Sequence, residues 1–154
     1  MYRRTIDIEV EMIHEVGYRS RTVFQDHNHH LELTMLFQVG TGIVLEVEAK
    51  LIRAPFPECQ LGIEAVKNLI GFPAVSFKSS KEIFNLTAGP TGCTHLAEMV
   101  VESVKARLQA ADYQRPDWID PDLTEKRHQM WENNWANTCI HYTDPYWKPH
   151  VIEK

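Results

Sequence analysis

The sequence predicts an α+β domain, in which an antiparallel sheet carries helices packed on one face. Two patterns lead to this prediction. Apolar residues alternate with polar ones through much of residues 5–51, and apolar residues recur at helical spacing after residue 94. Strands followed by helices are typical of α+β proteins. A chain of 154 residues can bury one core of ordinary size without disulfides.

The sheet is predicted from three segments. Residues 5–14 alternate in the manner of a half-buried strand, with apolar positions at Ile6, Ile8, Val10 and Met12. A shorter strand is expected around residues 22–25. The strongest pattern is a long hairpin, in which residues 31–39 and 43–51 alternate on either side of the turn at Gly40–Gly42.

Helices are predicted after the hairpin. One should run from about Cys59 to Ile70 and end at Gly71 and Pro73, with its inward positions at Ala65, Val66, Leu69 and Ile70. Residues 75–86 fit either a short helix or an edge segment. A longer helix is expected over residues 94–110. Its apolar stripe is Leu96, Val100, Val104, Leu108 and Ala111.

The composition changes after Asp112, which predicts a division into an α+β domain over residues 1–112 and an extension over residues 113–154. The extension holds all four tryptophans, Trp118, Trp131, Trp135 and Trp147, and a predicted helix over residues 123–135. We expect these aromatic side chains to pack on the domain or across the interface of a homo-oligomer. The alternative is an aromatic lid over a site or a partner surface.

Charge and hydropathy exclude several classes of function. A net charge of −5 leaves no cationic face for nucleic acid or anionic lipid. No apolar run approaches the ~20 residues of a membrane span, and the N-terminal residues lack the apolar segment of a secretion signal. We therefore expect a cytoplasmic protein. Its three cysteines should be thiols that pack, bind metal or react, since a reducing compartment disfavours disulfides.

Unusual residues gather where predicted elements begin. Cys59 and Cys93 open the two predicted helices, and the run DHNHH (Asp26–His30) leads into the hairpin. A helix N-terminus stabilises a thiolate, which is both the metal ligand and the nucleophile. The alternative is that the cysteines simply pack, because free cysteine is among the most buried residue types. Compact zinc motifs are missing, so a metal site would combine distant segments.

Two motifs resemble a known family. The run RAPFPECQLGIEAVKNLIG, followed by LTAGPTGCTHLAEMVVESV, is similar to the bacterial domain-of-unknown-function family 2889, whose members share the GCTHL helix start. The resemblance covers roughly residues 1–112 and implies no activity.

A more distant resemblance is to iron–sulfur scaffold proteins of the NifU and IscU type. CTHLAE (Cys93–Glu98) matches their third cysteine motif, Cys59 follows the hairpin as their second cysteine does, and His30 stands at the first cysteine position. This likeness implies a scaffold-like fold and a metal site with His30, Cys59 and Cys93 as ligands. His95 or Glu32 would be the fourth ligand. Such a set suits Zn²⁺, a non-cluster iron or a Rieske-like iron–sulfur cluster.

Three functions follow from these observations. We expect a small metal-binding protein, acting as a metal or cluster carrier or as an accessory subunit of a larger enzyme complex. The second is a metal- or thiol-dependent enzyme of hydrolase or lyase type acting on a small molecule, with Cys93 as nucleophile and His95 or His30 as base. The third is an assembly module whose cysteines only pack.

Overall fold

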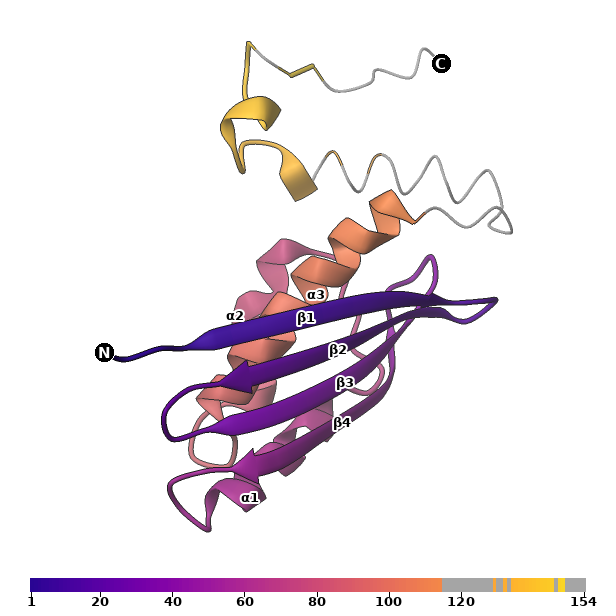
Figure 1. Cartoon of the computed structure of the whole chain (residues 1–154). Coiled ribbons are helices and arrows are strands. Elements are labelled where there is room, and N and C mark those ends of the chain that lie inside the picture. Colours follow the sequence, from indigo (N-terminus) through magenta and orange to yellow (C-terminus); the bar gives the residue numbers. More distant parts are fainter. Residues whose placement is uncertain (115–128, 130–131, 133, 146, 149–154) are drawn as a thin grey trace. The chain divides into compact units, whose positions relative to one another are not determined.

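The computed structural model describes residues 1–114, 129, 132, 134–145 and 147–148 (Figure 1). The chain forms two compact units, Met1–Pro116 and Asp117–Lys154. None of the described helices is long and apolar enough to cross a membrane.

The first unit contains a four-stranded antiparallel sheet with strand order β1-β2-β3-β4. The strands are β1 (Thr5–Ile13), β2 (Gly17–Gln25), β3 (His30–Gln38) and β4 (Val44–Arg53). The predicted hairpin is confirmed as β3 and β4. β2 is longer than the strand predicted around residues 22–25. The prediction was too short because two of the inward-facing residues of β2 are polar and interrupt the apolar alternation. These are Ser20 and Thr22, and the hydroxyl of Thr22 lies 2.6 Å from that of Ser103 in the core.

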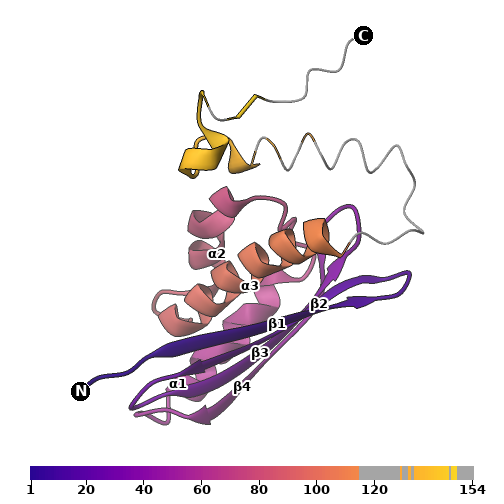
Figure 2. The same cartoon turned by 45° about the horizontal axis from the view of Figure 1, so that its top comes forward.

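The helical segments follow the sheet in the chain and cover one of its faces, as Figure 2 shows. They are α1 (Cys59–Gly62), η1 (Ile63–Leu69), η2 (Phe77–Ser79), α2 (Ser80–Thr87) and α3 (Thr94–Tyr113), where η denotes a 3-10 helix. α3 packs on β1, β2 and β3, while η1 packs on β4 and α2 lies against α3 and η1. The α+β class with helices on one face is therefore confirmed. The likeness to the NifU and IscU fold stays a prediction.

The apolar stripe predicted for the long helix is buried in α3. Its members Leu96, Val100, Val104, Leu108 and Ala111 all belong to the core of the first unit. The prediction succeeded because these residues recur at the helical period and a single face of α3 meets the sheet.

The helix predicted over residues 59–70 is present from Cys59 to Leu69 and combines two helix types. Only Cys59–Gly62 is α-helical, and the rest is the 3-10 helix η1. Its buried residues Ile63, Val66 and Leu69 are three apart, which matches three residues per turn. Ile70, which was expected to point inward, is 57% exposed because the chain has left the helix there.

The strand register defines the two faces of the sheet. Phe24 of β2 pairs with Ile6 of β1 and with Leu31 of β3, which pairs in turn with Leu51 of β4. Paired residues in an antiparallel sheet point to the same side, and alternate residues along a strand point to opposite sides. This row and its alternates form the covered face, under the helices. The residues between them form the open face, which bears the ion pairs of Glu11 with Arg19 and Arg21.

The second unit is described only in part. Its described residues include η3 (Ile140–Tyr142), and Tyr142 contacts Trp135 and Trp147 with ring centroids 5.8 Å apart in each pair. Trp135, Tyr142 and Trp147 of the extension therefore pack in a chain of ring contacts through Tyr142. The helix predicted over residues 123–135 lies largely outside the described residues, and so do Trp118 and Trp131.

Candidate metal centre

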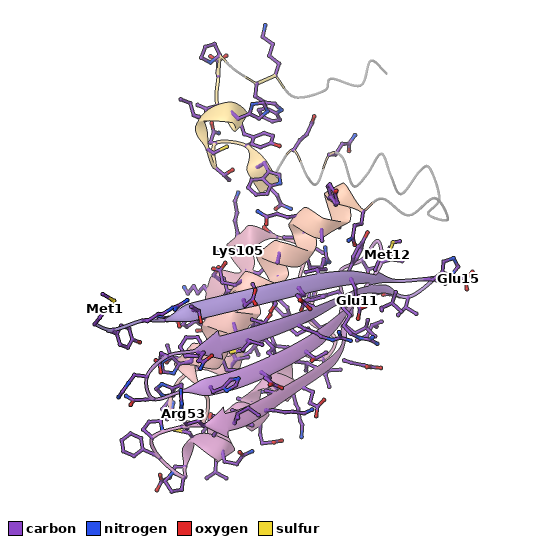
Figure 3. All side chains as sticks on the ribbon, in the orientation of Figure 1. Met1, Glu11, Met12, Glu15, Arg53 and Lys105 are labelled. Atoms are coloured by element: carbon purple, nitrogen blue, oxygen red, sulfur yellow. The ribbon has the colours of Figure 1, made fainter. Side chains whose placement is uncertain are left out.

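One end of the sheet brings together the turn between β2 and β3 and the beginning of α3. Figure 3 shows Arg53 and Met1 at this end, whereas Glu15, in the turn between β1 and β2, lies at the other end. Three segments lie at this end of the sheet: the residues before β1, the β2–β3 turn and the first turn of α3.

The β2–β3 turn is fixed by Asp26. Its Oδ1 accepts hydrogen bonds from the backbone amides of Asn28 (2.8 Å) and His29 (2.7 Å), and its own amide donates to the carbonyl of His29 (3.0 Å). Arg53 of β4 donates to the Asp26 carbonyl at 2.8 Å. This is a two-residue hairpin loop reinforced by an Asp side chain that bonds the backbone ahead of it. The carboxylate is therefore held in place by the local chain.

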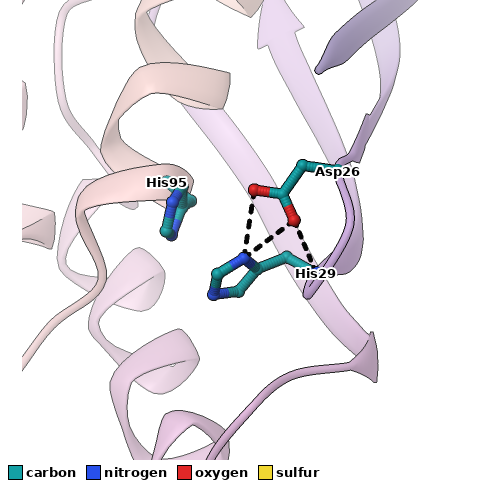
Figure 4. A group of neighbouring side chains, drawn as sticks. All are labelled: Asp26, His29 and His95. Carbon is teal, nitrogen blue, oxygen red and sulfur yellow. Dashed lines mark hydrogen bonds and ion pairs between the residues drawn. The ribbon is translucent and has the colours of Figure 1, made fainter. Parts of the chain in front are cut away.

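The same hairpin geometry places Asp26 and His29 on the covered face. Gln25 pairs with His30, so Asp26 and His29 are opposite one another at the next position. They lie two residues from Phe24 and Leu31, which point into the core. The His29 Nδ1 atom is 3.0 Å from Asp26 Oδ1 and 3.2 Å from Oδ2, as drawn in Figure 4.

His95 reaches this turn from the first turn of α3. Its ring centroid lies 4.2 Å from that of His29 and 5.0 Å from that of Phe24. The position depends on Gly92, where an added Cβ would lie 2.2 Å from the Thr87 carbonyl oxygen. Any larger residue would push the start of α3 away from the end of α2, and His95 would move with it.

The surroundings hold Asp26 in its ionised form. Burial of the carboxyl favours the neutral acid, but hydrogen bonds from the amides of His29 and Asn28, the His29 ring and the Tyr2 hydroxyl outweigh it. Together they keep the pKa of Asp26 well below its usual value of 3.8. Tyr2 donates to Oδ2 at 3.0 Å, and this bond raises the pKa of Tyr2.

His95 is shifted toward its neutral form. Burial lowers the pKa of His95 below 6.5, and so does the nearby charge of His29 when that ring is protonated, whereas Glu98 and Asp26 act in the opposite direction. Arg4, which is ion-paired with Glu98 and lies 4.9 Å above the Phe24 ring, adds to the lowering. A neutral imidazole has a lone pair that can bind a metal or accept a proton.

Asp26, His29 and His95 thus form a group of three metal-type ligands. One ligand atom from each residue lies within 4.8 Å of the other two, and within the part of the chain that the structure describes this is the only such group of three or more His, Cys, Asp or Glu residues. The Asp26 side chain is 6% exposed and that of His29 16%. Figure 4 shows both side chains, from the turn, lying across from His95 of α3. The group could hold one metal ion.

The predicted ligands are divided between the two faces. His30 and Glu32 are close to each other, with Nε2 4.0 Å from Oε1, as expected for neighbours on one strand face. That face is the open one, since Leu31 and Leu33 between and after them are buried. His95 lies on the other side of the sheet with Asp26 and His29. The structure does not bring His30 and Glu32 into the group with His95.

The two cysteines do begin helices, as predicted. Cys59 is the first residue of α1, and Cys93 directly precedes α3. α1 also lies beside this helix start, since a Cβ added at Gly62 would be 3.6 Å from the Cys93 Cβ. Cys93 packs partly against the hydrophobic core. Neither cysteine belongs to the three-ligand group, and their role as ligands stays a prediction.

Sequence reasoning named His95 but missed Asp26 and His29. Both are in the DHNHH run that was singled out, from which the sequence interpretation chose His30 as the ligand. The available signal was the alternation that continues back from Leu31, which assigns His29 and not His30 to the buried side.

The fold and this group define a small α+β domain with a carboxylate–histidine cluster between a hairpin turn and a helix start. Residues 4–109 match the family model described as protein of unknown function (DUF2889), and the chain belongs to this family. Searches of curated proteins and of solved structures found no match.

Proposed function

We propose that this domain binds one divalent transition-metal ion, Zn²⁺ or Fe²⁺, through Asp26, His29 and His95. The observation that supports the proposal is that one ligand atom from each of the three residues lies within 4.8 Å of the other two, although the residues come from two segments that are distant in sequence.

The donor set fits these ions. Two imidazoles and one carboxylate are the ligands of many catalytic zinc sites and of non-haem Fe²⁺ sites. Metal–ligand bonds of about 2 Å place two ligand atoms of one ion roughly 3 Å apart. Asp26 Oδ1 and His29 Nδ1 are 3.0 Å apart and so already have this spacing. His95 would complete the set by a small rotation of its side chain.

The pKa shifts of two of the ligands also support metal binding. A metal ligand must be deprotonated, and the pKa shifts of Asp26 and His95 are both downward, toward the ligating forms. The backbone hydrogen bonds to Asp26 fix its orientation before any ion arrives. That support resembles the outer hydrogen bonds that orient ligands in known metal sites.

Three protein ligands would leave coordination positions open. A metal in such a site can polarise a substrate or lower the pKa of a bound water. This favours an enzyme, acting on a small molecule by hydrolase or lyase chemistry, over a metal carrier.

The test is zinc binding to chelator-treated protein, measured by calorimetry with elemental analysis. We expect about one zinc per chain, and His29→Ala and His95→Ala should each weaken the affinity by roughly 100-fold or more, since each removes a ligand. The matched control is His30→Ala, which changes the neighbouring histidine on the open face and should bind zinc as the parent does.

Other results would point elsewhere. If Cys59→Ser and Cys93→Ser lose the metal while His29→Ala retains it, the ligands are the predicted thiolates. Equal zinc affinity in His29→Ala and His30→Ala would refute the proposed site.

A second candidate function rests on the Asp26–His29 contact alone. A carboxylate that accepts the Nδ1 proton of a histidine leaves Nε2 as a base, as in hydrolytic triads. The Asp26–His29 pair could then act without metal. Hydrolysis of 4-nitrophenyl acetate that persists in excess chelator and is lost in Asp26→Asn and His29→Ala would support this function. Activity that requires added metal would exclude it.

A further inference from the structure

A hollow adjoins Asp26. It has a volume of about 710 Å³ and lies between the residues before β1 and the β2–β3 turn. Its lining includes Tyr2, Arg3, Thr5, Gln25, His27 and Asn28, and Asp26 contributes to its wall. This volume lies within the usual range for small-molecule pockets, roughly 300–1,000 Å³.

Asp26 connects the hollow to the proposed metal site. Its Oδ2 accepts the Tyr2 hydroxyl of the hollow, while His29 approaches the same carboxylate from the covered face. A molecule in the hollow would therefore lie next to a carboxylate that also belongs to the proposed metal site.

The hollow offers one cationic partner for an anion. Arg3 lines it and forms no ion pair with any described residue, whereas its neighbour Arg4 is paired with Glu98. Asp26, the acidic residue of the lining, accepts hydrogen bonds from two amides, the His29 ring and Tyr2, and forms no ion pair with Arg3. The guanidinium of Arg3 is thus an available partner for a carboxylate, which it can bind through two parallel hydrogen bonds.

The rest of the lining fits the body of a small organic acid. Tyr2 and Met1 offer apolar surface, and Thr5, Gln25 and Asn28 offer hydrogen-bonding groups. We infer that this hollow binds a small monocarboxylic acid, with Arg3 receiving the carboxylate. The inference rests on the proposed function to the extent that the metal beyond Asp26 would act on the bound acid.

The experiment is an NMR titration of the full-length ¹⁵N-labelled protein with pentanoate, and with pentanamide as the uncharged equivalent. It is run on zinc-free and on zinc-loaded protein. We expect saturable shifts of the backbone amides of Thr5, Gln25 and Asn28 with pentanoate in both samples, and much weaker shifts with pentanamide. Arg3→Met should weaken pentanoate binding by about tenfold or more, because a charge-assisted hydrogen bond is lost.

The control is Arg19→Met, which removes an arginine from the open face and should leave the affinity unchanged. Equal pentanoate affinity in Arg3→Met and the parent, equal binding of pentanamide, or shifts confined to other residues would overturn the inference. A zinc titration of the parent decides the metal site separately, because the pentanoate shifts are also measured without zinc.

Discussion

The two faces of the sheet each carry a histidine beside a carboxylate, but the surroundings of the two histidines differ. His29 and His30 are adjacent in sequence, yet His29 lies beside Asp26, His95 and Phe24 under α3, whereas His30 lies near Glu32 on the open face. A histidine next to a carboxylate occurs on both sides. Only the covered face adds a second histidine from another element and enough burial to lower the pKa of that histidine. The Asp26–His29 pair belongs to a candidate site because α3 adds His95 to it, whereas none of the described helices covers the His30–Glu32 pair.

The largest expected difference between the faces is in the stability lost on truncating a side chain, and it is expected at Phe24. Its ring is fully buried between His95, His29 and the guanidinium of Arg4. Phe24→Ala should lower the free energy of unfolding by about 3–5 kcal/mol, because it opens a cavity in the core. Val23→Ala, on the open face, should cost about 1 kcal/mol or less. Urea denaturation measures both, and equal losses would contradict the assignment of the faces.

The next effect concerns the hydrogen bond between β2 and α3. Thr22→Val keeps the shape of the side chain but removes the hydroxyl that meets Ser103, and should cost about 1 kcal/mol. Ser103 would retain its bond to the Met99 carbonyl. Thr34→Val, the same change on the open face, should be nearly neutral in the same denaturation assay. A loss for Thr34→Val as large as that for Thr22→Val would show that the hydroxyl pair contributes nothing specific.

A smaller effect depends on pH. The pKa of His95 in the folded, metal-free protein is below 6.5, so the unfolded chain binds this proton more readily. The stability should therefore decline as the pH falls below about 6.5 and through the folded pKa. His95→Gln should flatten this decline, while His30→Gln should not. Thermal unfolding between pH 7.5 and 4.5 in excess chelator measures the slopes, and parallel curves for parent and His95→Gln would contradict the shift.

The smallest effect is expected on the open face itself. Glu11 forms ion pairs with Arg19 at 3.4 Å and with Arg21 at 3.2 Å, and the side chains of Glu11 and Arg21 are exposed while that of Arg19 is partly exposed. Glu11→Gln should change the unfolding free energy by no more than about 0.5 kcal/mol, because water and salt screen such pairs. A loss above about 1 kcal/mol that disappears in 1 M salt would show that this face is more strongly coupled than its exposure implies.

The sequence by itself determined the α+β class, the β3–β4 hairpin and the buried stripe of α3. These features follow from local periodicity, since a pattern of two or of about three and a half residues directly sets which side chains share a face. It also pointed to DHNHH and to GCTHL as the chemically unusual segments. Where polar residues masked the period, as Ser20 and Thr22 did in β2, the predicted strand was too short. The three-residue spacing of the buried positions in η1 belongs to a 3-10 helix, a type that the prediction did not specify.

Only the tertiary structure decided which of these residues meet. His95 is 66 residues from His29 in the chain, and nothing in either segment states that the start of α3 lies over the β2–β3 turn. That contact depends on the packing of α3 across β1, β2 and β3 and on the close approach of Gly92 to Thr87. A change of one residue in strand phase exchanges His30 for His29, because neighbouring side chains of a strand point to opposite faces and only one of those faces is covered.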